Sequence, residues 1–217
     1  MIPFSVSPYV PARSISAAWP EALRRIVANG HTVGEVIDQN GKRTYELEGL
    51  HITLSEPLKG MIPTIPRFTG VTAWDVKSWL DEYFEGEIFS IDRLGFDYIY
   101  GEWLVPGILH AVHELEMHPT SRRIIIPVGD ADDMRKPNPP CLRELWLHLR
   151  NGRLNGGTFW RSREFAGAAA SNMYGIIRLI SMAADELGVP MGTYEDISAS
   201  AHINILDNLW WVEKVIR

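Results

Sequence analysis

The sequence predicts an α+β fold, with helices packed on a sizeable sheet. Three observations indicate this class. Helix-spaced and strand-alternating apolar patterns both occur, they follow one another without strict β–α alternation, and no unit of about 20 to 50 residues repeats. At 217 residues the chain is long enough for a full core, so we expect residues 1–217 to form a single domain.

The composition excludes some classes of partner. A net charge of −6 argues against a nucleic acid polymer or an anionic membrane surface, because both attract clustered surplus cation. The N-terminus, Met1-Ile2-Pro3, lacks the basic and apolar regions of a signal peptide, and no stretch approaches about 18 continuous apolar residues. We therefore expect a cytoplasmic globular protein without a membrane span.

The N-terminal part of the chain carries one helical and one extended pattern. Helical spacing runs from Trp19 to Ala28, with Pro20 suited to the first turn and Gly30 to the stop. Apolar residues alternate through Arg43 to Leu54 on both sides of Gly49, which predicts a strand with a bulge or bend at that glycine.

Two more helices are expected in the middle of the chain. Met61 to Pro66 is typical of an ordered Pro-rich connection, and Ala73 to Phe84 of a helix. A further amphipathic helix should follow Pro106 and end near His118, because the residue before Pro119 disfavours helical geometry. Its apolar positions are Ile108, Leu109, Val112 and Leu115.

A strand and a hairpin come next. Arg122 to Ile126 is short and β-branched, which predicts a buried strand that opens on two arginines. After the polar loop from Gly129 to Pro140, alternating leucines run from Leu145 to Asn151-Gly152. That dipeptide is the strongest short hairpin signal, and Leu154 to Trp160 supplies the return strand.

The C-terminal part carries a long helix and an alternating strand. Ser171 is suited to cap the helix, and Gly188 followed by Pro190 to end it. The apolar stripe of the helix is Met173, Ile176, Ile177, Ile180, Ala183, Ala184 and Leu187. Ile197 to Ile205 alternates, which predicts one apolar strand face. The polar face is Ser198, Ser200, His202 and Asn204, and it lines a site if it does not face solvent.

The chain has one cysteine, Cys141, which excludes an intrachain disulfide and any multi-cysteine zinc or iron–sulfur site. It follows Pro139-Pro140, where a stiff loop enters the hairpin. Arg161-Ser162 lies twenty residues later, across the hairpin, so Arg161 is expected beside the thiol, where its charge favours the thiolate. Arg122-Arg123 adds to the positive field or binds an anion with bidentate geometry.

Five separated blocks of the sequence keep a fixed order. They are Ser121-Arg122-Arg123-Ile124-Ile125, Pro140-Cys141, Arg161-Ser162, Asn172 and His202. These blocks resemble the successive signature blocks of thymidylate synthases. The spacings from Cys141 to Arg161, and from Arg161 to the last two blocks, match that family without gaps. The resemblance covers about half of the chain, from Phe96 to Asn204.

The resemblance implies a large mixed sheet and covalent catalysis on a pyrimidine nucleotide. The Cys141 thiolate would add to C6 of the base, so that C5 can attack a one-carbon unit supplied by 5,10-methylenetetrahydrofolate as co-substrate. Methylation of dUMP to dTMP is the first expectation. The second is a hydroxymethylase acting on dUMP or a cytosine nucleotide, in which water rather than hydride captures the exocyclic methylene. A homologue that only binds nucleotide follows.

The resemblance also implies how the nucleotide phosphate is held. Arg43, Arg161 and Ser162 would bind the 5′-phosphate. Arg122 and Arg123 resemble the pair that reaches across the family's dimer interface to the phosphate of the partner chain. A homodimer is therefore implied.

Further roles follow for the base, the sugar and the folate. Asn172 resembles the amide that pairs with O4 and N3 of uracil, because it offers one donor and one acceptor. His202 resembles the residue at the sugar hydroxyl, and Tyr100 the tyrosine of the proton-transfer network near C5. Asn204 stands where the family usually has a sugar-binding tyrosine, and Glu164 where it has an aspartate that helps to hold the folate.

Two features of the family have no single counterpart. Asp75, Asp81 and Glu82 compete for the place of the catalytic glutamate on the expected helix from Ala73. The sequence ends at Arg217, without the C-terminal segment that closes over the folate in usual members and excludes water. The product therefore stays open between methyl and hydroxymethyl.

His110, His113 and Glu114 offer an alternative of another class, a metal enzyme. Two histidines near one helical turn apart can bind a metal, and a neighbouring glutamate can act as base. A catalytic zinc site needs three protein ligands, and no third is evident in the sequence. A solvated helix face is the preferred interpretation, and no metal is expected.

Overall fold

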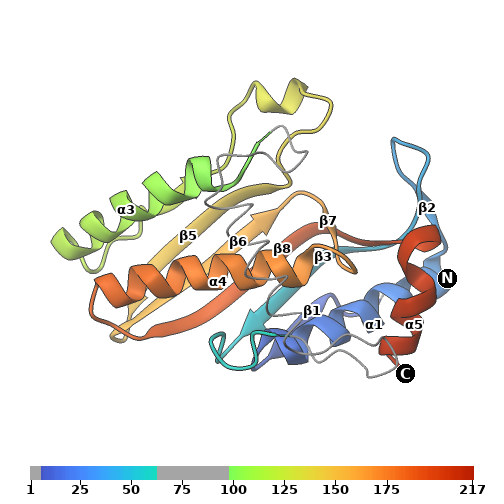
Figure 1. The fold of residues 1–217 in the computed structure, drawn as a ribbon, viewed down its shortest axis with the longest axis horizontal. Helices are drawn as coiled ribbons and strands as arrows, with labels where there is room; N and C mark the ends of the chain where they lie inside the picture. The colour runs from blue at the N-terminus through green and yellow to red at the C-terminus, as the bar shows by residue number, and fades with distance from the viewer. Residues whose placement is uncertain (1–5, 63–97) are drawn as a thin grey trace.

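Figure 1 shows the computed structural model, in which residues 6–62 and 98–217 are described. Eight strands form one sheet in the order β1-β3-β8-β6-β5-β4, with β2 also beside β3 and β7 beside β8. Parallel and antiparallel pairs both occur, so the sheet is mixed. The strands are β1 (Tyr9–Ala12), β2 (Val36–Ile37), β3 (Arg43–Leu54), β4 (Ile125–Pro127), β5 (Leu142–Arg150), β6 (Arg153–Trp160), β7 (Arg163–Glu164) and β8 (Met191–Asn204).

Helices pack on this sheet, and α3 and α4 run across the same face of it (Figure 1). This confirms the predicted α+β class, with helices on a large mixed sheet. The helical segments are α1 (Ile15–Val33), α3 (Gly101–Met117), the 3-10 turn η3 (Asp133–Arg135), α4 (Ala169–Glu186), the π-helical turn η4 (Ile205–Leu209) and α5 (Trp210–Val215). Within residues 6–62 and 98–217, every helix is too short or too polar to span a membrane.

The first helix is longer than the sequence pattern predicted. Helix α1 begins four residues before Trp19, so Pro20 lies inside it rather than at its start. Gly30 also lies inside the helix and is buried, whereas the stop falls at Gly34, whose φ is 104°. The extension follows from burial, because Ile15 and Ala18 are as fully enclosed as the predicted centre.

Helix α4 forms the centre of the core. Its predicted apolar stripe is buried from Met173 to Ala184, and Gly188, with a φ of 66°, follows its end as predicted. Ser171 is not the cap, because the helix starts at Ala169 and encloses Ser171 completely. Three successive alanines from Ala168 favour earlier helix initiation, since alanine has the highest helix propensity.

Strand β3 has the predicted bounds, and Gly49 bends it with a left-handed φ of 67°. Pairing with β8 stays in register across this point, from Glu48 opposite Ser200 to Leu50 opposite Ser198. The buried positions nevertheless change parity, from Leu47 before the glycine to Leu50 after it. The left-handed residue therefore interrupts the two-residue alternation, and β8 follows because the strands remain paired.

The prediction of one apolar face from Ile197 to Ile205 is therefore wrong in its first half. Ser198 is fully buried there, whereas Ile197 is only partly buried and Ala199 is exposed. Beyond the change of parity the expected pattern returns, with Ala201 and Ile203 buried. Ile205 lies past the strand, in η4.

The hairpin of β5 and β6 matches its prediction. Asn151 and Gly152 have φ values of 53° and 68°, as a type I′ turn requires, and they place Arg150 opposite Arg153. This pairing continues to Glu144 opposite Phe159 and, after a shift of one residue in β5, ends with Leu142 opposite Trp160.

The prediction of a buried strand from Arg122 to Ile126 is wrong in both its bounds and its burial. The segment forms only β4, of three residues, at the edge of the sheet, with Ile125 52% exposed. Among residues 6–62 and 98–217 it pairs with β5 alone, which does not fit the buried strand that was predicted. At the opposite edge of the sheet path lies β1, of four residues, and each of these outer strands contains a proline, Pro127 or Pro11.

Helix α3 ends at Met117, as expected, but begins at Gly101 and so contains Pro106. Its predicted stripe is correct except at Leu109, which is 68% exposed. The helix expected from Ala73 to Phe84 lies outside the described residues.

Gly107 of α3 packs against Ile126 of β4, and this contact yields the first prediction. A methyl group there would lie 2.3 Å from Cγ2 of Ile126, so Gly107→Ala should lower the free energy of unfolding by about 1–3 kcal/mol, despite the better helix propensity of alanine. Urea denaturation measures this loss.

The control is the same substitution in an Ile126→Ala background. Only Cβ of residue 126 then remains, 3.2 Å away, so Gly107→Ala should cost much less there. Equal losses in the two backgrounds would contradict the packing assigned to this contact.

Candidate active site

Cys141 lies partly buried at the entry to β5. The hairpin brings Arg161 alongside it, because the Arg161 amide donates a hydrogen bond of 2.9 Å to the Cys141 carbonyl. The guanidinium of Arg161 points at the preceding loop, where Nη2 donates to the Pro139 carbonyl at 2.7 Å and Nε to the Pro140 carbonyl at 3.2 Å. The Arg161 side chain thus fixes Pro139 and Pro140, the two residues before Cys141, by hydrogen bonds to their carbonyl groups.

Tyr100 lies on the other side of this entry point, at the start of α3, and is 5% exposed. Its hydroxyl accepts a hydrogen bond of 3.4 Å from the amide of Leu142, the residue after Cys141. Its ring stands edge-on to Trp160, with centroids 5.7 Å apart. Tyr100 and Cys141 are 41 positions apart in the sequence, yet the Tyr100 hydroxyl is bonded to the residue that follows Cys141.

His202 and Asn204 lie at the end of β8. His202 is paired with Glu46 of β3 on one side and Glu164 of β7 on the other. Burial lowers the pKa of His202, although the two carboxylates oppose this effect. Its imidazole is therefore neutral at neutral pH and can accept or donate one hydrogen bond at each ring nitrogen. Asn204 is partly buried opposite Thr44.

Asn172 lies in the first turn of α4 and is 8% exposed. Ser162, half-buried, occupies the bend between β6 and β7. Both residues therefore belong to the stretch that leaves β6 and enters α4, and the positive end of the α4 dipole lies at this turn.

The carboxylate of Glu164 is occupied by the same stretch of chain. It accepts hydrogen bonds from the amides of Ala166, at 3.3 Å, and Gly167, and one of 3.0 Å from the side-chain amide of Asn208. Glu164 therefore ties the entry of α4 to η4. A ligand would have to share or displace these bonds.

Arg43 is likewise engaged. Its Nε and Nη2 form a bidentate ion pair with Glu35, at 2.5 and 2.8 Å, and the Arg43 side chain is 53% exposed. A phosphate at this position would compete with Glu35 for the guanidinium.

Arg122 and Arg123 are not close to Cys141 within one chain. Both are exposed and precede β4, which pairs Ile125 with Trp146, five residues beyond the cysteine along β5. The arginines precede Ile125 by two and three residues, which makes them level with positions seven and eight residues beyond Cys141. At about 3.4 Å per strand residue, they lie roughly 25 Å from the cysteine along the strand. Within the described part of the chain, neither guanidinium forms an ion pair.

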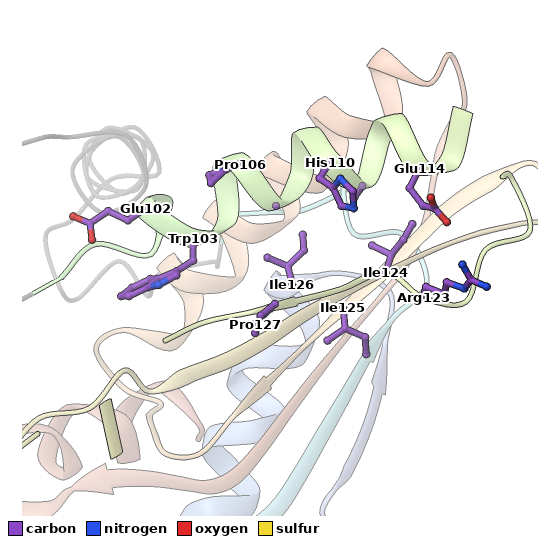
Figure 2. Close-up of a pocket in the computed structure, with 12 residues that line it drawn as sticks. Glu102, Trp103, Pro106, His110, Glu114, Arg123, Ile124, Ile125, Ile126 and Pro127 are labelled. Atoms are coloured by element: carbon purple, nitrogen blue, oxygen red, sulfur yellow. The ribbon is translucent and has the colours of Figure 1, made fainter. Parts of the chain in front are cut away.

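Figure 2 shows two of the three residues of the metal-enzyme alternative, His110 and Glu114. His110 and Glu114 face a groove of about 570 Å³ between α3 and β4, with Arg123 at its end. The Glu114 carboxylate accepts a hydrogen bond of 2.9 Å from Ser121, and His113 is near Glu116 instead. Residues 6–62 and 98–217 contain no group of three His, Cys, Asp or Glu side chains placed to hold a metal.

One charged pair was missed by the sequence interpretation. Arg163 and Asp196 are 2% and 1% exposed and form an ion pair inside the molecule. Arg163 stands between Ser162 and Glu164 in the sequence, in a run of charged residues that is typical of a surface. The even-numbered positions of β8 were expected to be its polar face, and only the change of parity at Gly49 makes Asp196 a core residue.

Comparison with known proteins places this geometry in context. A family model described as thymidylate synthase matches residues 65–208. A protein of Methanosarcina barkeri named "Putative thymidylate synthase" is 32% identical, with 99% of this chain and 97% of that protein covered. One of the same name from Methanothermobacter thermautotrophicus is 29% identical, with 96% and 98% covered. A "Thymidylate synthase" of Symbiobacterium thermophilum is 30% identical over 49% of this chain and 39% of that protein.

The environment of His202 predicts how stability depends on pH. The unfolded chain protonates this residue at its ordinary pKa of 6.5, whereas burial lowers the pKa in the folded chain. The unfolded state therefore binds the proton first as pH falls, and the wild type should lose stability relative to His202→Gln below about pH 6.5.

Denaturation midpoints of both proteins at pH 7.5 and 5.5 measure this difference, and the other histidines cancel between them. A stability difference that is the same at both pH values would contradict the assignment.

Proposed function

The chain belongs to the thymidylate synthase family, and we propose that it transfers a one-carbon unit from 5,10-methylenetetrahydrofolate to C5 of dUMP, which gives dTMP. The observation that carries the proposal is the position of Cys141, with the backbone of Arg161 bonded to it on one side and the Tyr100 hydroxyl one residue away on the other. A partly buried thiol with a phenol hydroxyl one residue away suits covalent activation of a base.

The chemistry begins at the thiolate of Cys141. Its sulfur forms a bond to C6 of the uracil ring, and the electrons of the C5–C6 double bond move toward C5 and the O4 carbonyl. C5 becomes a nucleophile and accepts the one-carbon unit. Loss of the C5 proton and cleavage of the bond between the one-carbon unit and the folate nitrogen would leave a methylene group on C5. A hydride from the folate would then add to that carbon as the Cys141 sulfur leaves C6, which restores the C5–C6 double bond and the free thiolate. Tyr100 would act in the proton transfer near C5, where its hydroxyl lies next to Leu142.

The folate would supply the one-carbon unit and, for a methyl product, a hydride. Glu164 is the residue of the described chain that we assign to holding it. Its carboxylate fits this role only by exchanging bonds, because Ala166, Gly167 and Asn208 already donate to it. Asp75, Asp81 and Glu82, the candidates for the catalytic carboxylate, lie outside the described residues.

The phosphate would be held by Arg161, Ser162 and Arg43. A guanidinium has five N–H donors, and Arg161 uses only two of them on the proline carbonyls, so it can hold the loop and an anion at once. Arg43 is half-exposed and can turn from Glu35 to a dianion, which offers more charge than one carboxylate.

The base and sugar would be read from two elements. The Asn172 amide can donate to O4 and accept from N3–H of uracil, a pattern that cytosine does not present. His202 and Asn204, at the end of β8, would contact the sugar hydroxyl. The neutral state that burial favours for His202, by lowering its pKa, suits a hydrogen bond to a hydroxyl.

Arg122 and Arg123 would serve the site of a second chain in a homodimer. Their separation from Cys141 along β5 supports a role in another chain's site, and their exposure, without an ion pair in the described part of the chain, leaves both guanidinium groups accessible to a phosphate.

Identification of the product tests the proposal. The protein is incubated with methylenetetrahydrofolate and dUMP, dCMP, UMP or CMP, and the nucleotide is identified by mass while dihydrofolate is followed by absorbance. We expect a methylated product from dUMP, with one dihydrofolate formed per turnover. A hydroxymethyl nucleotide with tetrahydrofolate would replace the proposal by the hydroxymethylase, and dCMP as the substrate would overturn the role of Asn172.

Cys141→Ser tests the nucleophile. Loss of a covalent nucleophile should lower turnover by at least about a thousandfold, with little change in nucleotide affinity. Nucleotide binding by calorimetry separates a lost reaction from a lost site. Full turnover by Cys141→Ser would show that another group attacks the base.

Mixed dimers test the shared site. Neither Cys141→Ser nor the Arg122→Ala/Arg123→Ala double variant should be active alone. After refolding together, they should recover activity, because one of the two sites in a heterodimer then has both an intact thiol and the partner's arginines. Absence of recovery in dimers shown to be mixed would refute the cross-chain role.

A further inference from the structure

We propose that Arg163 is a positioning residue of the nucleotide site, one that fixes Trp160 behind Tyr100 and the first turn of α4 behind Asn172. This inference rests on the proposed function, because it assigns Tyr100 and Asn172 their roles there. Arg163 itself is almost fully buried and would not touch the nucleotide.

The guanidinium of Arg163 makes three different contacts. Nη1 donates to both carboxylate oxygens of Asp196, and Nη2 donates to the carbonyl of Ala169 at 2.8 Å. Its central carbon lies 4.1 Å from the centroid of the Trp160 ring. One planar group thus joins β7, β8, β6 and the start of α4.

The carboxylate of Asp196 accepts a further hydrogen bond from β8 itself. The Tyr194 hydroxyl donates to it at 2.8 Å, and burial, together with the Asp196 charge, raises the pKa of Tyr194 well above its ordinary value, so the phenol keeps its proton. Thr158 lies 2.8 Å from Tyr194 and accepts a hydrogen bond of 3.0 Å from the Trp160 indole. A chain of donors therefore runs from Trp160 to Asp196.

Trp160 is consequently fixed from two directions. Its indole N–H is held by the Thr158 hydroxyl, and its face lies on the Arg163 guanidinium. The Tyr100 ring stands edge-on to this tryptophan. Because the Tyr100 hydroxyl meets the amide next to Cys141, the angle of the tryptophan helps to set where the phenol lies.

The Nη2 group of Arg163 bonds to the first turn of α4, which carries Asn172. Ala169 is the first residue of α4, and Asn172 follows three residues later in the same turn. A hydrogen bond to the Ala169 carbonyl fixes this turn relative to β7 and β8. The same guanidinium therefore positions both the phenol beside the thiol and the amide assigned to the base.

The alternative is that the pair only stabilises the fold. A buried ion pair is weak evidence for stability, because the desolvation of both charges offsets their attraction, and neutral replacements of similar volume are often harmless. Removal of both charges therefore distinguishes the two roles. A lysine could keep the charge but would lose the planar fork and the stacking on Trp160.

The test compares Arg163→Met/Asp196→Asn, which leaves no buried charge unpaired, with the wild type and Arg163→Lys. Thermal melts should show the double variant folded. Its turnover on dUMP should fall on the order of 100-fold, the scale expected when catalytic groups move by about 1 Å. Arg163→Lys should recover part of this loss. The exposed pair Arg13–Glu56 supplies the control Arg13→Met/Glu56→Gln, which should retain turnover.

Alkylation of Cys141 gives a readout that needs no substrate, because the chain has one thiol. The pH dependence of its rate should shift in the double variant, since Tyr100 and the entry to β5 move, and stay unchanged in the control. If the wild type transfers no one-carbon unit but this shift occurs, the proposed function fails and the positioning role stands. A folded double variant with wild-type turnover and an unshifted alkylation profile would overturn the positioning role.

Discussion

The pairing of β5 with β6 is the constraint on which the candidate site depends. Neither Cys141 nor Arg161 belongs to a strand. The type I′ turn at Asn151-Gly152 fixes the register as far as Glu144 opposite Phe159, and a one-residue shift between Glu144 and Leu142 then brings Cys141 opposite Arg161. A slip by one residue would turn every side chain of β5 to the other face. The position of Cys141 relative to Arg161 therefore depends on both the turn at one end of the hairpin and the register shift at the other.

Most polar groups of the site are bonded within the chain. Arg161 holds two proline carbonyls, Arg43 holds Glu35, and Glu164 holds the entry to α4. Such bonds keep long side chains in one geometry before a ligand arrives, which lowers the ordering cost of binding. The affinity for a ligand then depends on how much more strongly these side chains bind the ligand than their partners within the chain. A dianionic phosphate is therefore favoured over anions of lower charge.

The parts of the molecule that the sequence predicts well are those governed by short-range rules. The hairpin dipeptide, the apolar stripe of α4 and its glycine stop depend on neighbours within a few residues. The proximity of Cys141 to Arg161 could also be predicted, because the two residues flank a hairpin that its turn dipeptide identifies. The burial of Asp196 could not, because it depends on a left-handed glycine in another strand. The exposure of Ile125 likewise depends on the place of β4 at the edge of the sheet, which no local pattern encodes.

The two outer strands have a consequence for how copies of the chain meet. A long, flat edge with free amides is a template for strand addition and leads to fibrous aggregates. Here β1 has four residues and β4 three, and Pro11 and Pro127 each remove one amide donor from their strand. Growth of the sheet by adding strands is thereby disfavoured at both ends of the path. A strand of another chain added at either end of the described sheet would therefore form fewer hydrogen bonds than one added to a long, proline-free edge.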